Sequence, residues 1–175
     1  MANLDNPKGF WPIRHLCGGE IRTNTYIVTT STAAIYKGDA LKVVAAGTVE
    51  VAGATSGVIV VGVAAEWVTA AKAATAGTTI QVYDDPFIVF GVQCDSGTAA
   101  AAIDVFSTAD LVVTTGDTVL GISKHELDTS DLAAGSQASL KVIGLVDEPG
   151  NAWGEHADVE VLFNEHLYKA AVAGV

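Results

Sequence analysis

The chain of 175 residues contains little cysteine and few aromatic residues. Cys17 and Cys94 are the two cysteines, and their wide separation excludes a disulfide framework and a Cys-x-x-Cys zinc site. Aromatic residues make up 7% of the chain although hydrophobic residues make up 50%, because much of the apolar content is Ala and Val. Since each buried CH₂ contributes about 0.8 kcal/mol, we expect a modest core that gains from burial against partner subunits.

Long apolar runs are absent as well. Gly, Thr or charged residues interrupt every run well before the roughly 18 residues that a membrane-spanning helix needs. The first residues contain no basic cluster followed by an apolar stretch, so we expect no cleaved signal peptide. These features predict a protein that is made in a cytoplasm, remains in solution and has no membrane partner.

Basic residues are scarce, with 9 Lys and Arg against 20 Asp and Glu, and the net charge is −11. Such a charge repels the phosphate backbone, so we expect no direct binding of nucleic acid. The imbalance is uneven along the chain. Residues 1–42 hold five basic and three acidic residues, and the rest of the chain holds four and seventeen. The front of the chain is therefore mildly basic, and the remainder predicts a solvated acidic surface.

Motifs of catalytic and cofactor sites are missing. The sequence has no Gly-x-Gly-x-x-Gly before a helix, no phosphate-binding loop and no Gly-x-Ser-x-Gly elbow. His15 and Cys17 lie close together, but on a stretch rich in Pro and Gly that predicts no catalytic pair. His125 and Glu126 are interpreted as an exposed helix face, and Cys94 as a buried apolar residue. We expect no enzyme activity, no cofactor and no metal site.

What the sequence does contain is a series of short runs rich in β-branched residues, each bounded by Gly, Thr or Ser. Such runs are typical of the strands of a small barrel or sandwich. The stretch 36–83 holds several of them and opens with a turn at Gly38-Asp39. The clearest candidate strands are residues 25–30, 48–51, 58–65, 79–83, 87–94, 139–146 and 157–163.

One short helix is expected at residues 124–132. Ser123 is a candidate N-cap, Glu126 occupies the capping-box position, and Gly135 would end the helix. Residues 67–74 are rich in Ala but flanked by Val, Thr and Gly, so a loop and a single helical turn both remain open. The predicted class is all-β, a small β-barrel or β-sandwich body with one short helix.

Residues 1–25 differ from the rest. Pro7 and Pro12 exclude a regular helix and favour extended backbone, yet the segment is too apolar for a free tail. We expect an extended N-terminal arm at 1–25, ahead of a body at 26–175, that packs either along its own body or against a neighbouring subunit.

Several short motifs resemble those of a known family. They are Asn-Pro-Lys-Gly-Phe at 6–10, Arg14-His15, Gly18-Gly19, Tyr-Lys-Gly-Asp at 36–39, Val-Gly-Val-Ala at 61–64, the run 140–144, Val-Glu-Val at 159–161 and Asn-Glu-His at 164–166. Together they resemble the head decoration, or cement, proteins of tailed bacteriophages.

This resemblance implies a β-tulip-like barrel or sandwich body with a projecting arm. It also implies a homotrimer on the outer surface of the virion, where it stabilises the lattice of the major capsid protein, and it transfers no catalytic residues. On this reading the arm contacts the capsid through Phe10, Trp11, Ile13, Arg14, Leu16 and Arg22.

A different class of function also fits the sequence. The chain could be a carbohydrate- or surface-binding β-module of a phage fibre or an adhesin. In that case an exposed Trp67 or Trp153 would stack on sugar rings.

Overall fold

A computed structural model describes residues 3–54, 57–133 and 138–169, and it confirms the all-β class. The described residues contain one α-helical turn, α1 (Ala70–Ala73), and two 3₁₀ turns at Ala102–Asp104 and Thr129–Asp131. The strands are β1 (Trp11–His15), β2 (Asn24–Ile27), β3 (Ala40–Val43), β4 (Val49–Val51), β5 (Gly62–Ala64), β6 (Thr79–Tyr83), β7 (Ile88–Gln93), β8 (Thr108–Ala109), β9 (Leu111–Val112), β10 (Glu126–Leu127), β11 (Leu140–Leu145) and β12 (Asp158–Phe163).

The first sheet is antiparallel with the strand order β1-β7-β12-β11-β8. All six residues of β7 are buried, as expected for a strand that is apolar on both faces. Strand β12 alternates between buried and half-buried positions, so Val159, Val161 and Phe163 face the core. Strand β1, from the expected N-terminal arm, lies at the edge of this sheet and pairs with β7.

The second sheet holds most of the stretch 36–83 in the order β2-β6-β5-β3-β4. Its two edges meet, because Val28, directly after β2, forms a bridge with Val49 of β4. The N–H of Thr29 also donates to the carbonyl of Val49 at 2.8 Å. The sheet therefore curls into a small barrel. Its interior is filled by Val28, Ile35, Leu41, Val49, Val61, Ala64, Val68, Ala73, Ile80 and Val82.

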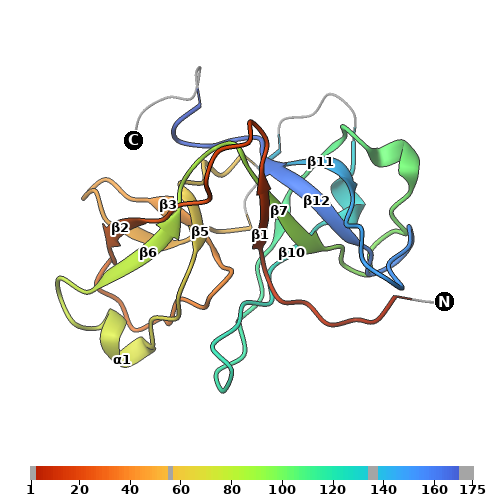
Figure 1. Cartoon of the computed structure of the whole chain (residues 1–175). Helices are drawn as coiled ribbons and strands as arrows, with labels where there is room; N and C mark the ends of the chain where they lie inside the picture. Colours follow the sequence, from red (N-terminus) through yellow and green to blue (C-terminus); the bar gives the residue numbers. More distant parts are fainter. Residues whose placement is uncertain (1–2, 55–56, 134–137, 170–175) are drawn as a thin grey trace.

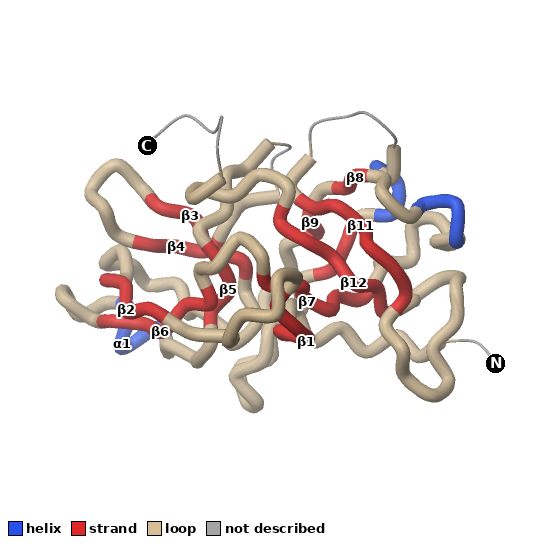
Figure 2. The backbone as a smooth tube through the Cα atoms, turned by 45° about the horizontal axis from the view of Figure 1, so that its top comes forward, coloured by secondary structure: helices blue, strands red, loops and turns tan. Residues whose placement is uncertain are grey.

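A larger core lies between the two sheets. Alternation along β3 and β5 sends Ala40 and Val63 toward this core and Leu41 and Ala64 into the barrel. Figures 1 and 2 show the resulting arrangement, with β2 to β6 and α1 on one side of the molecule and β7, β11 and β12 on the other. The second sheet thus contributes to two cores at once.

The prediction of a helix at 124–132 is wrong. Glu126–Leu127 is strand β10, which pairs with β9, and Thr129–Asp131 is a 3₁₀ turn. A polar side chain does cap a helical element here, but the element is the 3₁₀ turn, because the Asp128 side chain accepts from the N–H of Ser130. The short helical turn lies instead at Ala70–Ala73, within the segment for which a loop and a turn were both open. No helix in the described part of the chain is long and apolar enough to cross a bilayer.

Candidate docking surface

The six residues predicted to contact a capsid lie in three different environments. Phe10 is in the core, Trp11, Ile13 and Arg14 belong to the edge strand β1, and Leu16 and Arg22 are exposed beyond it. The sequence left open whether the segment packs along its own body or against a neighbouring subunit. Trp11–His15 packs along its own body, as a strand paired with β7. The exposed end of the segment, after β1, is the part that a partner can reach.

Phe10 is 2% exposed and belongs to the larger core. Its ring centroid lies 5.1 Å from that of Phe163 and 6.5 Å from that of Phe90, in the tilted and edge-to-face arrangements that aromatic pairs prefer. Its backbone N–H donates to the carbonyl of Gly38 at 2.9 Å. A partner cannot reach this side chain while the fold is intact, so Phe10 positions the segment and does not contact a capsid directly.

Trp11 covers the outer face of the first sheet. A Cβ placed on Gly91 of β7 would lie 2.2 Å from the Trp11 ring, so the indole packs directly on the bare backbone of its neighbour strand. The Nζ of Lys8 lies 3.9 Å from the ring centroid on the indole, in a cation–π contact. The ring is therefore held between a lysine and a glycine.

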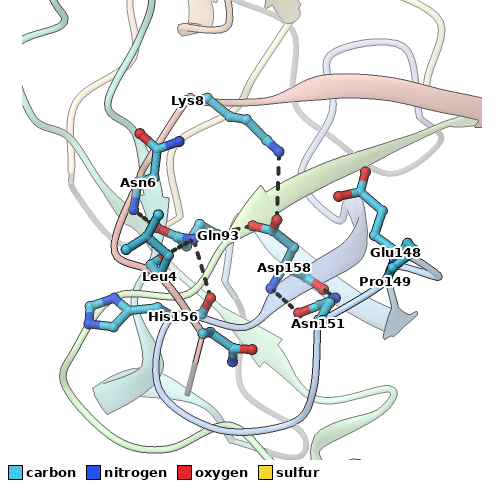
Figure 3. Close-up of a pocket in the computed structure, with 11 residues that line it drawn as sticks. Leu4, Asn6, Lys8, Gln93, Glu148, Pro149, Asn151, His156 and Asp158 are labelled. Carbon is cyan, nitrogen blue, oxygen red and sulfur yellow. Dashed lines mark hydrogen bonds and ion pairs between the residues drawn. The ribbon is translucent and has the colours of Figure 1, made fainter. Parts of the chain in front are cut away.

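The residues before β1 are fixed by polar contacts with Gln93, at the end of β7 (Figure 3). The Oε1 of Gln93 accepts from the N–H of Asn6 at 2.8 Å. Its Nε2 donates to the carbonyls of Leu4, at 3.0 Å, and His156, at 3.2 Å. A buried amide with these partners ties the front of the chain to the loop before β12.

A pocket of about 180 Å³ lies beside these contacts, between the front of the chain and the turn at Glu148–Asn151 (Figure 3). Within it the Nζ of Lys8 lies 3.6 Å from Asp158. Burial raises the pKa of Asp158, although the neighbouring Lys8 acts in the opposite direction. Asn151 donates to the backbone carbonyl of Asp158 at 2.7 Å and closes the pocket on that side.

Strand β1 carries features that protect an exposed sheet edge. Pro12 lacks a backbone donor, and the register shifts between Pro12 and Arg14, which leaves Ile13 as an unpaired bulge position. The Arg14 guanidinium donates to Oε2 of Glu160 at 2.6 Å on the outer face. These features fix β1 against its own sheet and disfavour the addition of another strand there.

The turn after β1 presents an apolar patch with a nearby cation. Leu16 and Phe87 are each 46% exposed, and the N–H of Leu16 donates to the carbonyl of Phe87 at 2.8 Å. Burial raises the pKa of the nearby Asp85 carboxyl, but hydrogen bonds from the Phe87 N–H and from His15 outweigh it and lower the pKa. The charge of the exposed Arg22 adds a smaller effect in the same direction. We call Leu16, Phe87 and Arg22 the turn patch.

His15 holds the turn patch in place. Its Nδ1 accepts from the N–H of Cys17 at 3.2 Å and of Gly19 at 3.0 Å, and its Nε2 lies 3.3 Å from Oδ2 of Asp85. Both ring nitrogens therefore make contacts that fix the conformation of the turn.

A second apolar patch lies on the loop 113–123, and sequence reasoning did not identify it. Asp117 caps the tip of the loop by accepting from the N–H groups of Val119 and Leu120. This Asp turn leaves Val119 84% exposed, and Leu120 and Ile122 are exposed beside it. Figure 1 shows the loop projecting from the body, opposite the turn after β1. We call Val119, Leu120 and Ile122 the loop patch. The signal that could have found it is a group of three apolar residues, interrupted by Gly121, that follows shortly after the Gly116-Asp117 turn.

The two tryptophans considered for sugar binding differ in their environment. Trp153 is half-buried and packs against the larger core. Trp67 is 36% exposed, and its ring stacks on that of Tyr36, with centroids 6.5 Å apart and an interplanar angle of 13°. Gly121 also packs on the indole, because a Cβ there would lie 2.4 Å from it. Trp67 is the more exposed of the two tryptophans.

One group among the described residues could hold a divalent ion. Asp5, Glu126 and His156 bring their ligand atoms within 4.8 Å of one another. The Nδ1 of His156 lies 3.9 Å from Oδ1 of Asp5. Burial, together with the carboxylates of Asp5 and Asp95, raises the pKa of Glu126 to about 6. The carboxylates thus repel one another slightly, as in a weakly held surface cluster.

His125 was interpreted as exposed on a helix face, and this is wrong. It is 1% exposed and lies beside Asp39 and Ser123 beneath the N-terminal segment. Its Nδ1 accepts from the N–H of Ala40 at 3.3 Å, and its Nε2 faces Asp39. Because Nδ1 accepts from a backbone N–H, the neutral ring carries its hydrogen on Nε2, which therefore cannot accept a proton from Ser123.

Cys94 is 1% exposed, and burial raises the pKa of its thiol to about 12. This confirms its interpretation as a buried apolar residue, because a thiol that stays protonated is a poor nucleophile.

No protein-family model matches the chain, and no curated protein sequence matches it.

Proposed function

We propose that this protein is a head decoration protein of a tailed bacteriophage, set on the outer capsid surface as a homotrimer. In this role it binds the major capsid protein and holds neighbouring capsid subunits together. The observation that carries the proposal is the turn patch. It joins exposed apolar side chains to Arg22 on a segment anchored in the core by Phe10, on a chain with a net charge of −11.

The turn patch is already held in one conformation in the free protein, and this favours tight binding. A flexible arm loses conformational entropy when it docks, which weakens binding. Here the strand pairing of β1, the burial of Phe10 and the His15 contacts already fix the turn in the free protein. A preorganised apolar patch of this kind suits a protein that must bind a repeating lattice tightly.

A decoration trimer needs two separate surfaces, one for the capsid and one for its own copies. The exposed apolar residues supply both. The turn after β1 and the loop 113–123, which carry the turn patch and the loop patch, lie on opposite sides of the molecule in Figure 1. We assign the turn patch to the capsid and the loop patch, with the nearby Trp67, to contacts between copies. Burying Val119 and Leu120 would remove the most exposed apolar side chains of the loop from water.

The assignment of the turn patch is tested with the double variant Leu16→Asp, Arg22→Glu. The probe is a preparation of expanded heads that lack their decoration protein, from the phage whose genome carries this gene. We expect at least tenfold weaker co-sedimentation, because the variant places acidic groups at the contact. Ile103→Asp, an equally polar change at an exposed residue elsewhere, is the matched control. Undiminished binding by the double variant would remove the turn patch from the proposal.

The homotrimer is tested by light scattering on the purified protein. We expect a mass of three times 17.9 kDa at micromolar concentration. The variant Leu120→Asp should shift the mass to 17.9 kDa, because a charge at an apolar contact is not solvated there. A wild-type protein that stays a monomer at all concentrations would contradict this part of the proposal.

A second candidate function is sugar binding by a fibre or adhesin module, and one observation favours it. Trp67 is 36% exposed, more than Trp153, and stacking on Tyr36 fixes its ring. Glycan-array binding that disappears in Trp67→Ala and persists in Trp153→Ala would support this function. Binding to heads without any glycan signal would favour the decoration protein.

A further inference from the structure

A pocket of about 280 Å³ lies beside β4 and reaches the buried residues Asp39 and His125. Its walls are mainly apolar and include Ala33, Ala34, Val51 and Val113. The two ionisable residues are 2% and 1% exposed. A mostly apolar cavity with one buried charged group is a common form of ligand site.

Asp39 lines this pocket, and one of its two carboxylate oxygens is buried without a hydrogen-bond partner among the described residues. Its Oδ2 accepts from the N–H of Tyr36 at 2.7 Å. Its Oδ1 lies 3.3 Å from Nε2 of His125, but the ring N–H does not point at it, so the contact lacks hydrogen-bond geometry. Within the described part of the chain, Oδ1 has no hydrogen-bond partner. Buried carboxylate oxygens are nearly always paired, so an orphaned one marks a place for a donor.

His125 does not neutralise this carboxylate. Because Nδ1 accepts from Ala40, the neutral ring carries its hydrogen on Nε2. Burial lowers the pKa of His125 to about 4, so the ring is uncharged at neutral pH. Burial raises the pKa of Asp39 to about 6, whereas hydrogen bonds from the Ser123 hydroxyl and the Tyr36 N–H favour the ionised carboxylate. Among the described residues, no Lys or Arg forms an ion pair with it.

We propose that this pocket binds a primary ammonium group carried on a short aliphatic stem. The ammonium would donate to Oδ1 of Asp39 in a charge-assisted hydrogen bond, and the stem would lie against Ala33, Ala34 and Val113. The pocket is large enough for such a group, because a butylammonium ion has five non-hydrogen atoms that need roughly 30 Å³ each. The group could come from a free alkylamine or from a lysine side chain of a docked protein. The site does not depend on the proposed capsid function.

The test is a titration of ¹⁵N-labelled protein at pH 7.5, followed through the amide resonances of Thr115 and Gly116, which line the pocket. Butylammonium is compared with 1-butanol, which has the same length and no charge. We expect saturable shifts with butylammonium and at least tenfold weaker binding of 1-butanol. Equal binding of both compounds, or no shift at these residues with butylammonium, would overturn the proposal.

A third probe, lysine blocked at both ends as N-acetyl-lysine methylamide, separates the two sources. Binding at least as tight as that of butylammonium would identify a lysine side chain of a partner. Exclusion of blocked lysine, with butylammonium still bound, would identify a free amine. Both results retain the site, since the ammonium group is common to them.

Variants locate the binding. Ala34→Leu fills the pocket without changing the contacts of Asp39, and Asp39→Asn removes the charge. Each should weaken butylammonium binding at least tenfold. Ala46→Leu, on the exposed turn between β3 and β4, is the matched control and should bind normally. If Asp39→Asn fails to fold, Ala34→Leu still decides, because undiminished binding by that variant would overturn the proposal.

Discussion

Phe10 is the residue that joins the N-terminal segment to the body. Its ring packs with those of Phe90 and Phe163 in a cluster of three, so the segment cannot leave without opening the larger core. A deletion of residues 1–25 would therefore remove part of the core together with the turn patch. Point variants separate these two effects.

We expect Phe10→Ala to lower the free energy of unfolding by about 3–5 kcal/mol, because it removes a buried ring and leaves a cavity. Urea unfolding monitored by tryptophan fluorescence measures this change. Leu16→Ala, six residues later and half exposed, should change the free energy by less than about 0.5 kcal/mol. An equally small change for Phe10→Ala would show that Phe10 lies outside the core in solution.

His166 should make stability depend on pH. It is 1% exposed, and burial, with Lys169 nearby, lowers its pKa to about 4. In the unfolded chain the pKa is about 6.5. Between about pH 6.5 and pH 4 the unfolded state therefore binds a proton at His166 that the folded state does not bind. The free energy of unfolding falls by on the order of 3 kcal/mol as the pH falls through this window.

His166→Asn tests this dependence, because Asn does not titrate and can still accept from the N–H of Tyr168. We expect the variant to be less stable at pH 7 but to lose less stability between pH 7 and pH 4.5. Urea unfolding across this range measures both slopes. Parallel slopes for the two proteins would contradict the lowered pKa of His166.

At the scale of elements, the seating of β1 depends on one close contact. Trp11 lies directly on Gly91, so Gly91→Ala must displace the indole from β7. We expect a loss of about 1–3 kcal/mol in unfolding free energy and faster amide exchange in β1. Gly144→Ala, in strand β11 of the same sheet, is the control, because a Cβ there meets no atom within 4 Å. Equal effects of the two substitutions would show that Trp11 does not pack on β7.

The elements that the sequence predicted well are those with a strict pattern. Strand β6 matches its predicted range, and β7 and β12 differ by one residue at their ends, because burial on one or two faces determines their composition. The predicted helix at 124–132 failed because its cap signals are local, whereas the burial of His125 and Leu127 depends on distant neighbours. Local capping chemistry does not distinguish a 3₁₀ turn from a helix.

For the whole molecule, the all-β class followed from composition and alternation, but the two cores did not. The closure of the barrel depends on the meeting of Val28 and Val49, and the pattern of single strands does not encode such a contact. The candidate site was predicted in part. Leu16 and Arg22 are exposed as a contact requires, whereas the burial of Phe10 and the exposure of the loop patch needed the tertiary structure.

The central claim concerns the whole molecule, and cryo-electron microscopy tests it most directly. Expanded heads that lack their decoration protein are imaged with and without the purified protein. We expect added density on the outer surface, sized for three chains of 17.9 kDa, with the turn after β1 against the shell. Heads that gain no density at saturating protein, or that hold the protein with the loop 113–123 against the shell, would contradict the proposed function.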